Sequence, residues 1–382
     1  MAERTTYALV VLLFAVACAF GQATGTGPDV LVFKDGEKLI GHLVSADDTS
    51  IVFKSDGLQT KKNAKNPDAG NVIVDWGKIQ EVQSSAKFAV IPKGVVLRGK
   101  NDTGKVAQGA VTTTDQQVQV KTAAVTPQSI PVTNVAEIVG QSAFEKAFRE
   151  RGFLSGWTGG ASAGIAYTQS TQKSENFSGA INLSRPVPGV DWADPRSNTL
   201  LTFNGAYGKI SQTGTPTTKT ALYHAGIEQD FYFNSRVFVF GQGLWDHNYS
   251  QGLNLQQDYG GGLGFVIFKK PNTGLDVRAS VDYIRQQFAL SSHNMNLIGS
   301  IFGENYFYKF GNGILFSEKG GYIPTWNNTN AYSAFANATL TFPVYHRFGF
   351  TIGALDTYLN NPPVGFKKNS FTLTMGAAYS LQ

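Results

Sequence analysis

The feature that most constrains the fold is a strict two-residue alternation over residues 369–381, at the end of the chain. Every second side chain there is apolar: Phe371, Leu373, Met375, Ala377, Tyr379 and Leu381. The side chains between them are small or polar: Thr372, Thr374, Gly376, Ala378 and Ser380. A period of two indicates a β-strand whose faces meet different surroundings. The apolar face would be the core of a soluble sandwich or the lipid face of a membrane barrel, and alternation alone does not choose between them.

Eleven earlier segments share this character, so we expect twelve antiparallel strands. They lie near residues 155–168, 176–185, 198–209, 219–233, 236–249, 256–268, 273–285, 294–309, 312–325, 331–345, 348–358 and 369–381. Four connections are very short: residues 234–235, 271–272, 311–312 and 346–347. Those on the other side are longer, for example 211–218 and 360–368, and residues 186–197 are a long exception on the short side. Short turns on one side and long loops on the other are typical of an outer-membrane barrel.

Aromatic residues gather beside the short turns. They are Phe231 to Phe233, Tyr306 to Tyr308, Phe342 with Tyr345, and Phe348 with Phe350. Aromatic girdles of this kind mark a membrane interface, whereas a soluble sandwich gives no reason for them to share one level.

The first residues predict export. Arg4 precedes an apolar run of 13 residues, 8–20, which is too short to span about 30 Å of hydrocarbon. We therefore expect a signal peptide over residues 1–23. Cys18 is the only cysteine and would leave with it, so the mature chain would hold no disulfide and no cysteine metal site. Since no later apolar stretch approaches 20 residues, strands rather than helices would cross the membrane.

A signal peptide followed by this Gly- and aromatic-rich barrel, with its alternating end from Phe371 to Leu381, resembles the salt-induced outer-membrane protein family. That family is a domain family of unassigned function, and the resemblance covers about residues 150–382. It implies a membrane barrel and no agreed catalytic residues. Tyr379 is followed by Leu381 and Gln382, although barrels of this type commonly end on an aromatic residue.

Residues 24–140 predict a duplicated small β-module. Short apolar runs alternate with Gly and Asp turns in two copies, about 29–85 and 88–140. Val30 to Val32 is matched by Val95 to Leu97, Gly41 to Leu43 by Gly109 to Val111, Ile51 to Phe53 by Val118 to Val120, and Ile79 to Val82 by Val135 to Ile138. Residues 59–70 are expected to form a loop that only the first copy has. The copies could form tandem SH3-like or Sm-like barrels or one combined sheet.

Residues 141–152 break the β pattern and predict a short linker helix, because Phe144, Ala147, Phe148 and Arg151 recur at helical spacing. The barrel would then occupy residues 153–382.

Two strands of the barrel predict a charged interior. In residues 273–285 the apolar set points outward, which turns Asp276, Arg278 and Asp282 inward. In residues 219–233 the same rule turns inward His224, Glu228 and Asp230. These six are the candidate lumen-lining residues. Charges of both signs can line a water-filled path or interlock as a plug of salt bridges.

Catalytic chemistry has little support in the sequence. The suggestive groupings are Asp246 and His247 with Ser250, and Ser291 with His293 and Asn294. Neither has the wider motif that a hydrolase would need. We predict no catalytic, cofactor-binding or metal residues. The net charge of +5 comes from basic residues that are mostly scattered, so we expect no nucleic-acid partner.

The expected protein is an all-β chain: a twelve-stranded transmembrane β-barrel preceded by the duplicated module. We expect it in the cell outer membrane with the module in the periplasm, as a non-enzymatic narrow channel or structural barrel. Its expected partners are outer-membrane lipid, the barrel assembly machinery, and a periplasmic protein or the cell wall. The alternatives are a lipid-modifying enzyme active at the barrel rim and a secreted β-rich adhesin.

Overall fold

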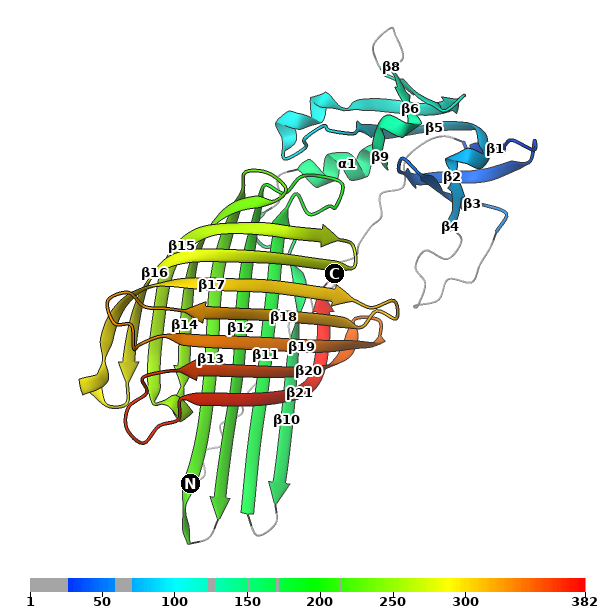
Figure 1. Cartoon of the computed structure of the whole chain (residues 1–382). Helices are drawn as coiled ribbons and strands as arrows, with labels where there is room; N and C mark the ends of the chain where they lie inside the picture. Colours follow the sequence, from blue (N-terminus) through cyan, green and yellow to red (C-terminus); the bar gives the residue numbers. More distant parts are fainter. Residues whose placement is uncertain are drawn as a thin grey trace, which may run out of the picture. The chain divides into compact units, whose positions relative to one another are not determined.

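The computed structural model describes residues 27–58, 71–122, 128–149, 152–169, 172–212 and 214–381. These residues form an amino-terminal β-module and a carboxy-terminal barrel (Figure 1). The predicted signal peptide, residues 1–23, and the extra loop, residues 59–70, lie outside the described residues. Among the described residues, no helix has the length and apolar character needed to cross a membrane.

The carboxy-terminal unit is a closed antiparallel barrel of twelve strands, which confirms the predicted architecture. Its strands are β10 Thr158–Gln169, β11 Gln172–Val187, β12 Ser197–Gln212, β13 Thr215–Tyr232, β14 Val237–Asn248, β15 Leu253–Lys270, β16 Thr273–Phe288, β17 Met295–Lys309, β18 Leu315–Ile323, β19 Ser333–Tyr345, β20 Phe348–Leu359 and β21 Asn369–Leu381. Each strand pairs with the next, and β10 pairs with β21 to close the ring.

One predicted loop is wrong. Residues 211–218 are mostly strand, because β12 continues to Gln212 and β13 begins at Thr215. Ile210 pairs with Thr218, so the hairpin ladder runs on through this segment. The segment is rich in threonine, which favours extended backbone, and its polarity misled the prediction of a loop. The long connections at residues 360–368 and 188–196 are present as expected.

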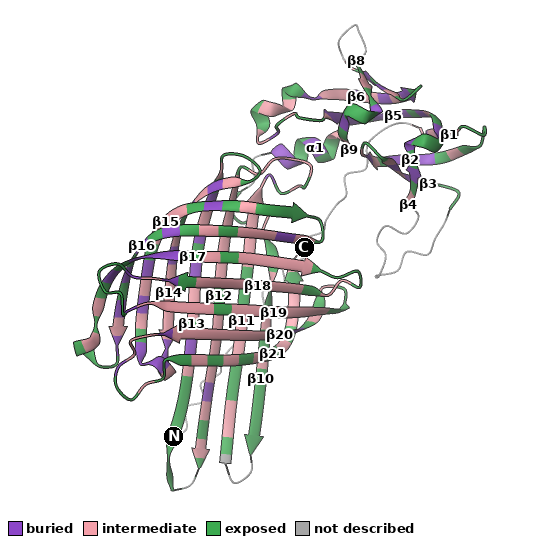
Figure 2. Cartoon of the chain, viewed as in Figure 1, coloured by how far each residue is buried: buried purple, intermediate pink, exposed green. Residues whose placement is uncertain are grey.

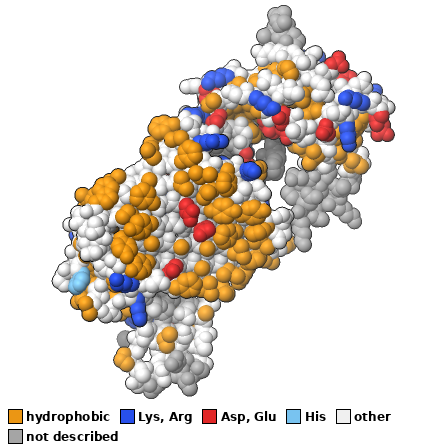
Figure 3. Space-filling model, in the orientation of Figure 1, with side chains coloured by type: hydrophobic (Ala, Val, Ile, Leu, Met, Phe, Trp, Pro, Cys, Tyr) orange, Lys and Arg blue, Asp and Glu red, His pale blue; other side chains and the backbone are white. Residues whose placement is uncertain are grey.

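The two faces of the barrel wall differ as the alternation predicts. On β21, Phe371, Leu373 and Met375 are 65%, 54% and 53% exposed, whereas Thr372 and Thr374 between them are half-buried. Exposed and less exposed residues also alternate along other strands (Figure 2). Hydrophobic side chains cover the visible barrel surface over much of its area (Figure 3). An apolar surface of this extent suits a lipid environment.

Three carboxylates interrupt this apolar surface. Glu304 pairs with outward Val277, Glu318 pairs with Tyr306, and Asp356 pairs with outward Phe371, so all three share the outward phase. Figure 3 shows acidic side chains within the hydrophobic area. Asp and Glu cost less than Arg or Lys on the lipid face of a barrel. These positions are not among the predicted site residues.

The amino-terminal unit is one continuous sheet of nine strands. They are β1 Asp29–Phe33, β2 Lys38–Ala46, β3 Ser50–Ser55, β4 Asn71–Asp75, β5 Ile79–Pro92, β6 Ala107–Thr114, β7 Gln117–Lys121, β8 Gln128–Pro131 and β9 Val135–Gly140. The pairs β1–β2, β2–β9, β9–β5 and β5–β1 close a small four-stranded ring. Both halves of the unit contribute to one hydrophobic core, which includes Phe53 and Val118. The structure therefore favours the combined sheet over tandem barrels.

The internal repeat is visible in equivalent glycines. A Cβ at Gly41 would lie 2.0 Å from the carbonyl oxygen of Lys54, and a Cβ at Gly109 would lie 2.0 Å from that of Lys121. Only glycine fits where two backbones approach so closely. Each copy also ends with a short 3₁₀ turn before its last strand, at Trp76–Lys78 and Val132–Asn134.

The expected match between Val30 to Val32 and Val95 to Leu97 is wrong. Residues 95–97 are not a strand. Asp29 pairs with Gly41 in the first copy, and Phe88 pairs with Gly109 in the second. The second half of β5 therefore takes the place of β1, so the copies share one long strand. The α-helix α1, Gln141–Phe148, follows β9, and its Phe144, Ala147 and Phe148 are buried.

Candidate functional site: the polar interior of the barrel

The six candidate lumen-lining residues take the inward phase of their strands. On β16 the even-numbered positions are the less exposed ones, with Asp282 at 1% and Val281 and Tyr283 beside it well exposed. On β13, Glu228 and Asp230 are buried at 6% and 1% between exposed Ile227 and Phe231.

Arg278 is the centre of a charged cluster inside the barrel. Its Nη1 forms an ion pair with Glu228 Oε1, and its Nη2 lies 2.7 Å from Asp276 Oδ1. Asn305 of β17 also donates to Asp276 Oδ1, at 3.1 Å. Lys319 of β18 adds a second cation that interacts with Glu228. Four of the six predicted residues, Asp276, Arg278, Glu228 and Asp230, thus contribute to one electrostatic cluster; we call it the Arg278 cluster.

Aromatic rings of β14 support the Arg278 guanidinium. Its Cζ lies 5.4 Å from the ring centre of Phe238 and 5.5 Å from that of Phe240. Such cation–π contacts gain strength where water is excluded. They hold the guanidinium in place between the carboxylates.

A row of inward glycines on β15 makes room for this arrangement. Gly260, Gly262 and Gly264 pair with Asp282, Ser280 and Arg278 respectively. A Cβ at Gly264 would lie 2.0 Å from the ring of Phe238, and one at Gly260 would lie 1.9 Å from Asp282 Oδ1. Side chains from β14 and β16 thus meet across this stretch of β15, which has no inward side chains. The run Gly260 to Gly264 is the sequence signal for this packing, and no prediction was drawn from it.

Asp282 belongs to a second polar layer. Gln242 Nε2 of β14 donates to Asp282 Oδ1 at 2.9 Å, and the Ser280 hydroxyl donates to Asp282 Oδ2. Asp258 of β15 is fully buried and interacts with Asp282. Farther along, Gln286 Nε2 donates to Gln256 Oε1 at 2.9 Å.

His224 is separate from the Arg278 cluster and pairs with Asp246 of β14, with 2.7 Å between Nδ1 and Oδ1. This pairing separates Asp246 from its sequence neighbour: His247 takes the opposite phase, and its Nδ1 lies 2.8 Å from the carbonyl oxygen of Asn254. The suggested Asp246, His247 and Ser250 grouping is therefore not assembled.

In the second suggested grouping, His293 contacts Ser292 rather than Ser291, with 3.3 Å between Ser292 Oγ and Nδ1. Asn294 Oδ1 instead accepts a hydrogen bond from the backbone N–H of Phe288. Within the described ranges, no three His, Cys, Asp or Glu side chains are placed to hold a metal ion.

The wall formed by β10 to β12 has a different character. Its outward residues include Ile165, Phe177 and Phe203. The opposite phase is uncharged and, apart from residues such as Leu200 and Ile210, carries mostly small side chains, among them Ser162, Ser174, Asn176, Ser178, Asn182, Thr202 and Asn204. The barrel interior is therefore asymmetric, with charges gathered on β13 to β18 and small polar groups on β10 to β12.

The loop end of the barrel is bridged by Gln251, which the sequence analysis did not identify. The short 3₁₀ turn Tyr249–Gln251 follows β14 and buries the Gln251 side chain to 3% exposure. Gln251 Nε2 donates to the carbonyl oxygens of Thr357 at 3.0 Å and Lys368 at 2.8 Å. Asn248 Nδ2 completes the bridge by donating to Gln251 Oε1 at 2.9 Å. The β14–β15 connection is thus fastened to β20 and to the connection that precedes β21.

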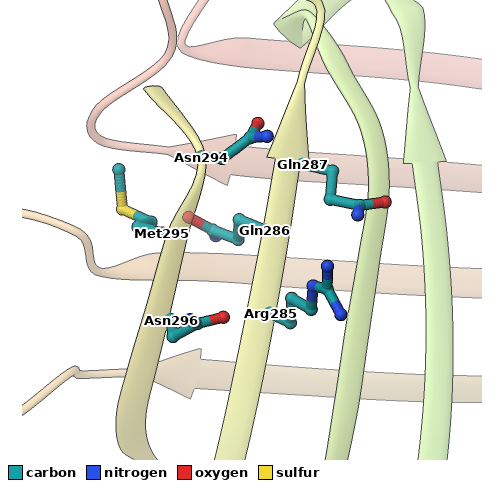
Figure 4. A pocket seen from close by; sticks show the side chains of 6 residues that line it. All are labelled: Arg285, Gln286, Gln287, Asn294, Met295 and Asn296. Carbon is teal, nitrogen blue, oxygen red and sulfur yellow. The ribbon is translucent and has the colours of Figure 1, made fainter. Parts of the chain in front are cut away.

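A small pocket of about 180 Å³ lies beside this end, between β16 and β17. Figure 4 shows Arg285 and Gln287 on one side of β16 and Gln286 on the other, toward Met295. Gln286 already bonds Gln256, whereas Arg285 and Asn296, which pair across the two strands, share the outward phase.

Comparison with known proteins assigns the chain to a family but indicates no activity. No curated protein matches the chain. A family model described as "Protein of unknown function, DUF481" matches residues 161–381, which is more than half of the 382 residues and nearly all of the barrel. The predicted membership of a domain family without assigned function is thereby confirmed, while its link to salt induction stays a prediction. The chain belongs to the family described as protein of unknown function, DUF481.

Proposed function

We propose that the protein is a non-enzymatic outer-membrane barrel that offers a narrow path to small polar solutes. The observation that carries this proposal is the asymmetry of the interior. The Arg278 cluster and the aromatic rings beside it occupy one wall, whereas the inward phase of β10 to β12 is uncharged and consists mostly of small side chains, many of them with hydroxyl or amide groups. A twelve-stranded barrel lies between eight-stranded barrels filled by side chains and sixteen-stranded open porins. A path along the small-residue wall fits that size.

Gln251 would control the loop end of this path. Its side chain ties the β14–β15 connection to β20 and to the connection before β21 through two backbone carbonyls. Loss of both bonds would loosen the connection, which would then be held to these segments by the hydrogen bonds from Lys367 N to Ser250 O at 3.1 Å and from Asn248 Nδ2 to Thr357 Oγ1 at 3.2 Å. The bridge is therefore the proposed constriction.

Single-channel conductance in planar lipid bilayers tests the proposal. We expect a small conductance for the natural protein and a larger one for Gln251→Ala. Tyr249→Ala is the matched control, because Tyr249 belongs to the same turn and is 55% exposed. If neither the natural protein nor Gln251→Ala conducts, although both show heat-modifiable gel mobility, the barrel has a structural role instead.

The amino-terminal module is proposed to bind a periplasmic partner. Ile40 and Val44 of β2 and Ile73 of β4 are 53%, 41% and 72% exposed. Val52 of β3 pairs with Ile73, which continues this apolar surface across the sheet. A periplasmic protein or a cell-wall surface would bind the module by burying these side chains. Sedimentation of the protein with purified cell walls, compared with an Ile73→Asp variant, tests the cell-wall alternative.

An enzymatic role has weaker support. His247 and His293, the histidines suggested at the rim, contact a backbone carbonyl and a neighbouring serine respectively. We expect simultaneous replacement of both by alanine to leave any lipid-hydrolysing activity of the purified protein unchanged. Complete loss of such an activity would reverse this ranking.

A further inference from the structure

The barrel closes along a short seam. The ladder between β10 and β21 joins residues 159–163 to residues 377–381 and covers five residue pairs. The ladder between β10 and β11, by contrast, runs from Thr158 to Gln169, the whole length of β10. Toward the loop end, residues 369–376 of β21 therefore pair with β20 alone.

Two glycines mark the point where the strands part. A Cβ at Gly164 would lie 2.1 Å from the carbonyl oxygen of Met375, and a Cβ at Gly376 would lie 2.3 Å from that of Ala163. The backbones touch here, immediately after the last paired residues. Beyond this vertex the two edges diverge.

A cavity of about 560 Å³ lies beyond the vertex. Consecutive residues line it, 164–166 on β10 and 370–375 on β21. Because successive side chains of a strand point to opposite faces, a cavity that reaches all of them passes through the edge of the wall. The cavity is thus an opening in the wall rather than a hollow on one side of it.

The lining divides into two chemical halves. The outward half is apolar, with Ile165, Phe177, Phe371, Leu373 and Met375. The inward half carries hydroxyl and amide groups, including Asn176, Ser178, Thr220, Thr372 and Thr374. None of the lining residues is charged. Its volume is in the range of small-molecule sites.

We propose that this opening between β10 and β21 admits a single-chain amphiphile with an uncharged polar head from the membrane. The alkyl chain lies against the outward apolar residues, and the head is received by the hydroxyl and amide groups inside. The inference rests on the proposed placement of the barrel in a membrane, and it does not require the barrel to conduct ions.

Photolabelling of the full protein in lipid vesicles tests the opening. The probe is a monoacylglycerol that carries a diazirine on its acyl chain near the ester, and mass spectrometry locates the labelled residues. We expect labels on residues 164–166 and 370–375, and we expect unlabelled monoacylglycerol to compete for them. Ser178→Trp should fill the inward half and lower this labelling about tenfold.

Ala180→Trp is the matched control, because Ala180 lies on the same strand and face but pairs with Ser162 beside the closed seam. It should leave the labelling unchanged. Heat-modifiable gel mobility checks that each variant folds, and Asn176→Leu, which removes an amide from the same inward half, replaces Ser178→Trp if that variant does not fold.

Labels spread evenly over the outward residues of the barrel, including Val281 and Phe302 on distant strands, would overturn the opening while leaving the membrane placement intact. Labelling of the seam that Ser178→Trp and Asn176→Leu leave unchanged would also overturn it. A folded barrel that takes no label at all would overturn the membrane placement and the opening together.

Discussion

Arg278 of β16 and Glu228 of β13 form an ion pair across the interior, although β14 and β15 separate their strands. The pair is nearly dry, with side-chain exposures of 10% and 7%. Gly264 of β15 leaves the space that the Phe238 ring fills, and this ring lies beside the Arg278 guanidinium. The strands between the partners thus shape the surroundings of the pair.

Removal of the Arg278 charge should destabilise the barrel. Arg278→Met leaves Glu228, Asp276 and Asp230 in the interior without their nearest cation. Breaking a buried pair by removing one partner costs about 3–5 kcal/mol. Urea unfolding of the protein folded into lipid vesicles measures this loss.

Two further variants show whether the loss comes from the unpaired charge. The double variant Arg278→Met with Glu228→Gln should recover part of the stability, because the unpaired carboxylate is then removed as well. Arg285→Met, on the outward phase of the same strand, should have little effect. Equal losses for Arg278→Met and Arg285→Met would contradict a buried pair.

Period-two reasoning located the strands and their faces because alternation is local. The faces of β13 and β16 follow from neighbours in the sequence such as Ile227 and Val281, which are apolar and exposed. Which charged side chains pair inside the barrel, by contrast, is decided by strands that are distant in the sequence. The glycine that makes room for the Phe238 ring beside Arg278 lies on a third strand, and a glycine gives no side-chain signal of which face it takes.

Other features could not be predicted from the sequence, for related reasons. Gln251 is an ordinary polar loop residue until the fold brings Thr357 and Lys368 to it. No face was predicted for Glu304 and Glu318, and the ladder places them outward beside Val277 and Tyr306. The match of Val95 to Leu97 with the first strand was wrong because a run of three apolar residues is common to many strands. Backbone pairing instead shows that the second half of β5 is the equivalent of β1.

The lipid and interior faces can be separated with one charge on each. Ala377 is on the outward phase of β21, where an arginine should cost about 2–4 kcal/mol near the bilayer midplane. Thr374 is on the inward phase, so Thr374→Arg should be tolerated better. Urea unfolding in lipid vesicles compares the two variants. Equal losses would count against the assigned faces.

The amino-terminal module should lose stability as the pH rises. Burial, together with the nearby charge of Asp47, raises the pKa of Glu137 to about 7. The neighbouring residue, Ile138, pairs with Ala46 just before Asp47. Burial opposes ionisation of Asp47 too, but hydrogen bonds from Thr49 and Ser50 hold the pKa of Asp47 below its usual value, which keeps a negative charge beside Glu137.

A raised carboxyl pKa means that the folded module binds the Glu137 proton more tightly than the unfolded chain does. The contribution of the protonated Glu137 carboxyl to the free energy of unfolding is therefore fully present below the unfolded pKa of about 4.3. It is lost as the pH rises through about 7. Amide hydrogen exchange of the full protein, corrected for intrinsic rates, should show β2 and β9 less protected at pH 8 than at pH 5.5. Glu137→Gln should abolish the difference, and Glu145→Gln on α1 should not. A pH-independent protection pattern in the natural protein would refute the coupling.

Strand number sets the orientation of the chain, and the orientation decides between the channel and adhesin hypotheses. Because the barrel has twelve strands, an even number, the chain enters its first strand and leaves its last strand on the same side of the membrane. An exported chain whose amino-terminal module stays in the periplasm then places Thr215, the first residue of β13, and Asn361, in the connection before β21, outside the cell, and the turn at Ser235 in the periplasm. The predicted mature chain has no cysteine, since Cys18 is the only one, so single cysteines can report on each position. On intact cells, Thr215→Cys and Asn361→Cys should react with a membrane-impermeant thiol reagent, whereas Ser235→Cys and Ile73→Cys should react only after the outer membrane is opened. Reaction of Ile73→Cys without reaction of Thr215→Cys would place the module at the cell surface and favour the adhesin instead.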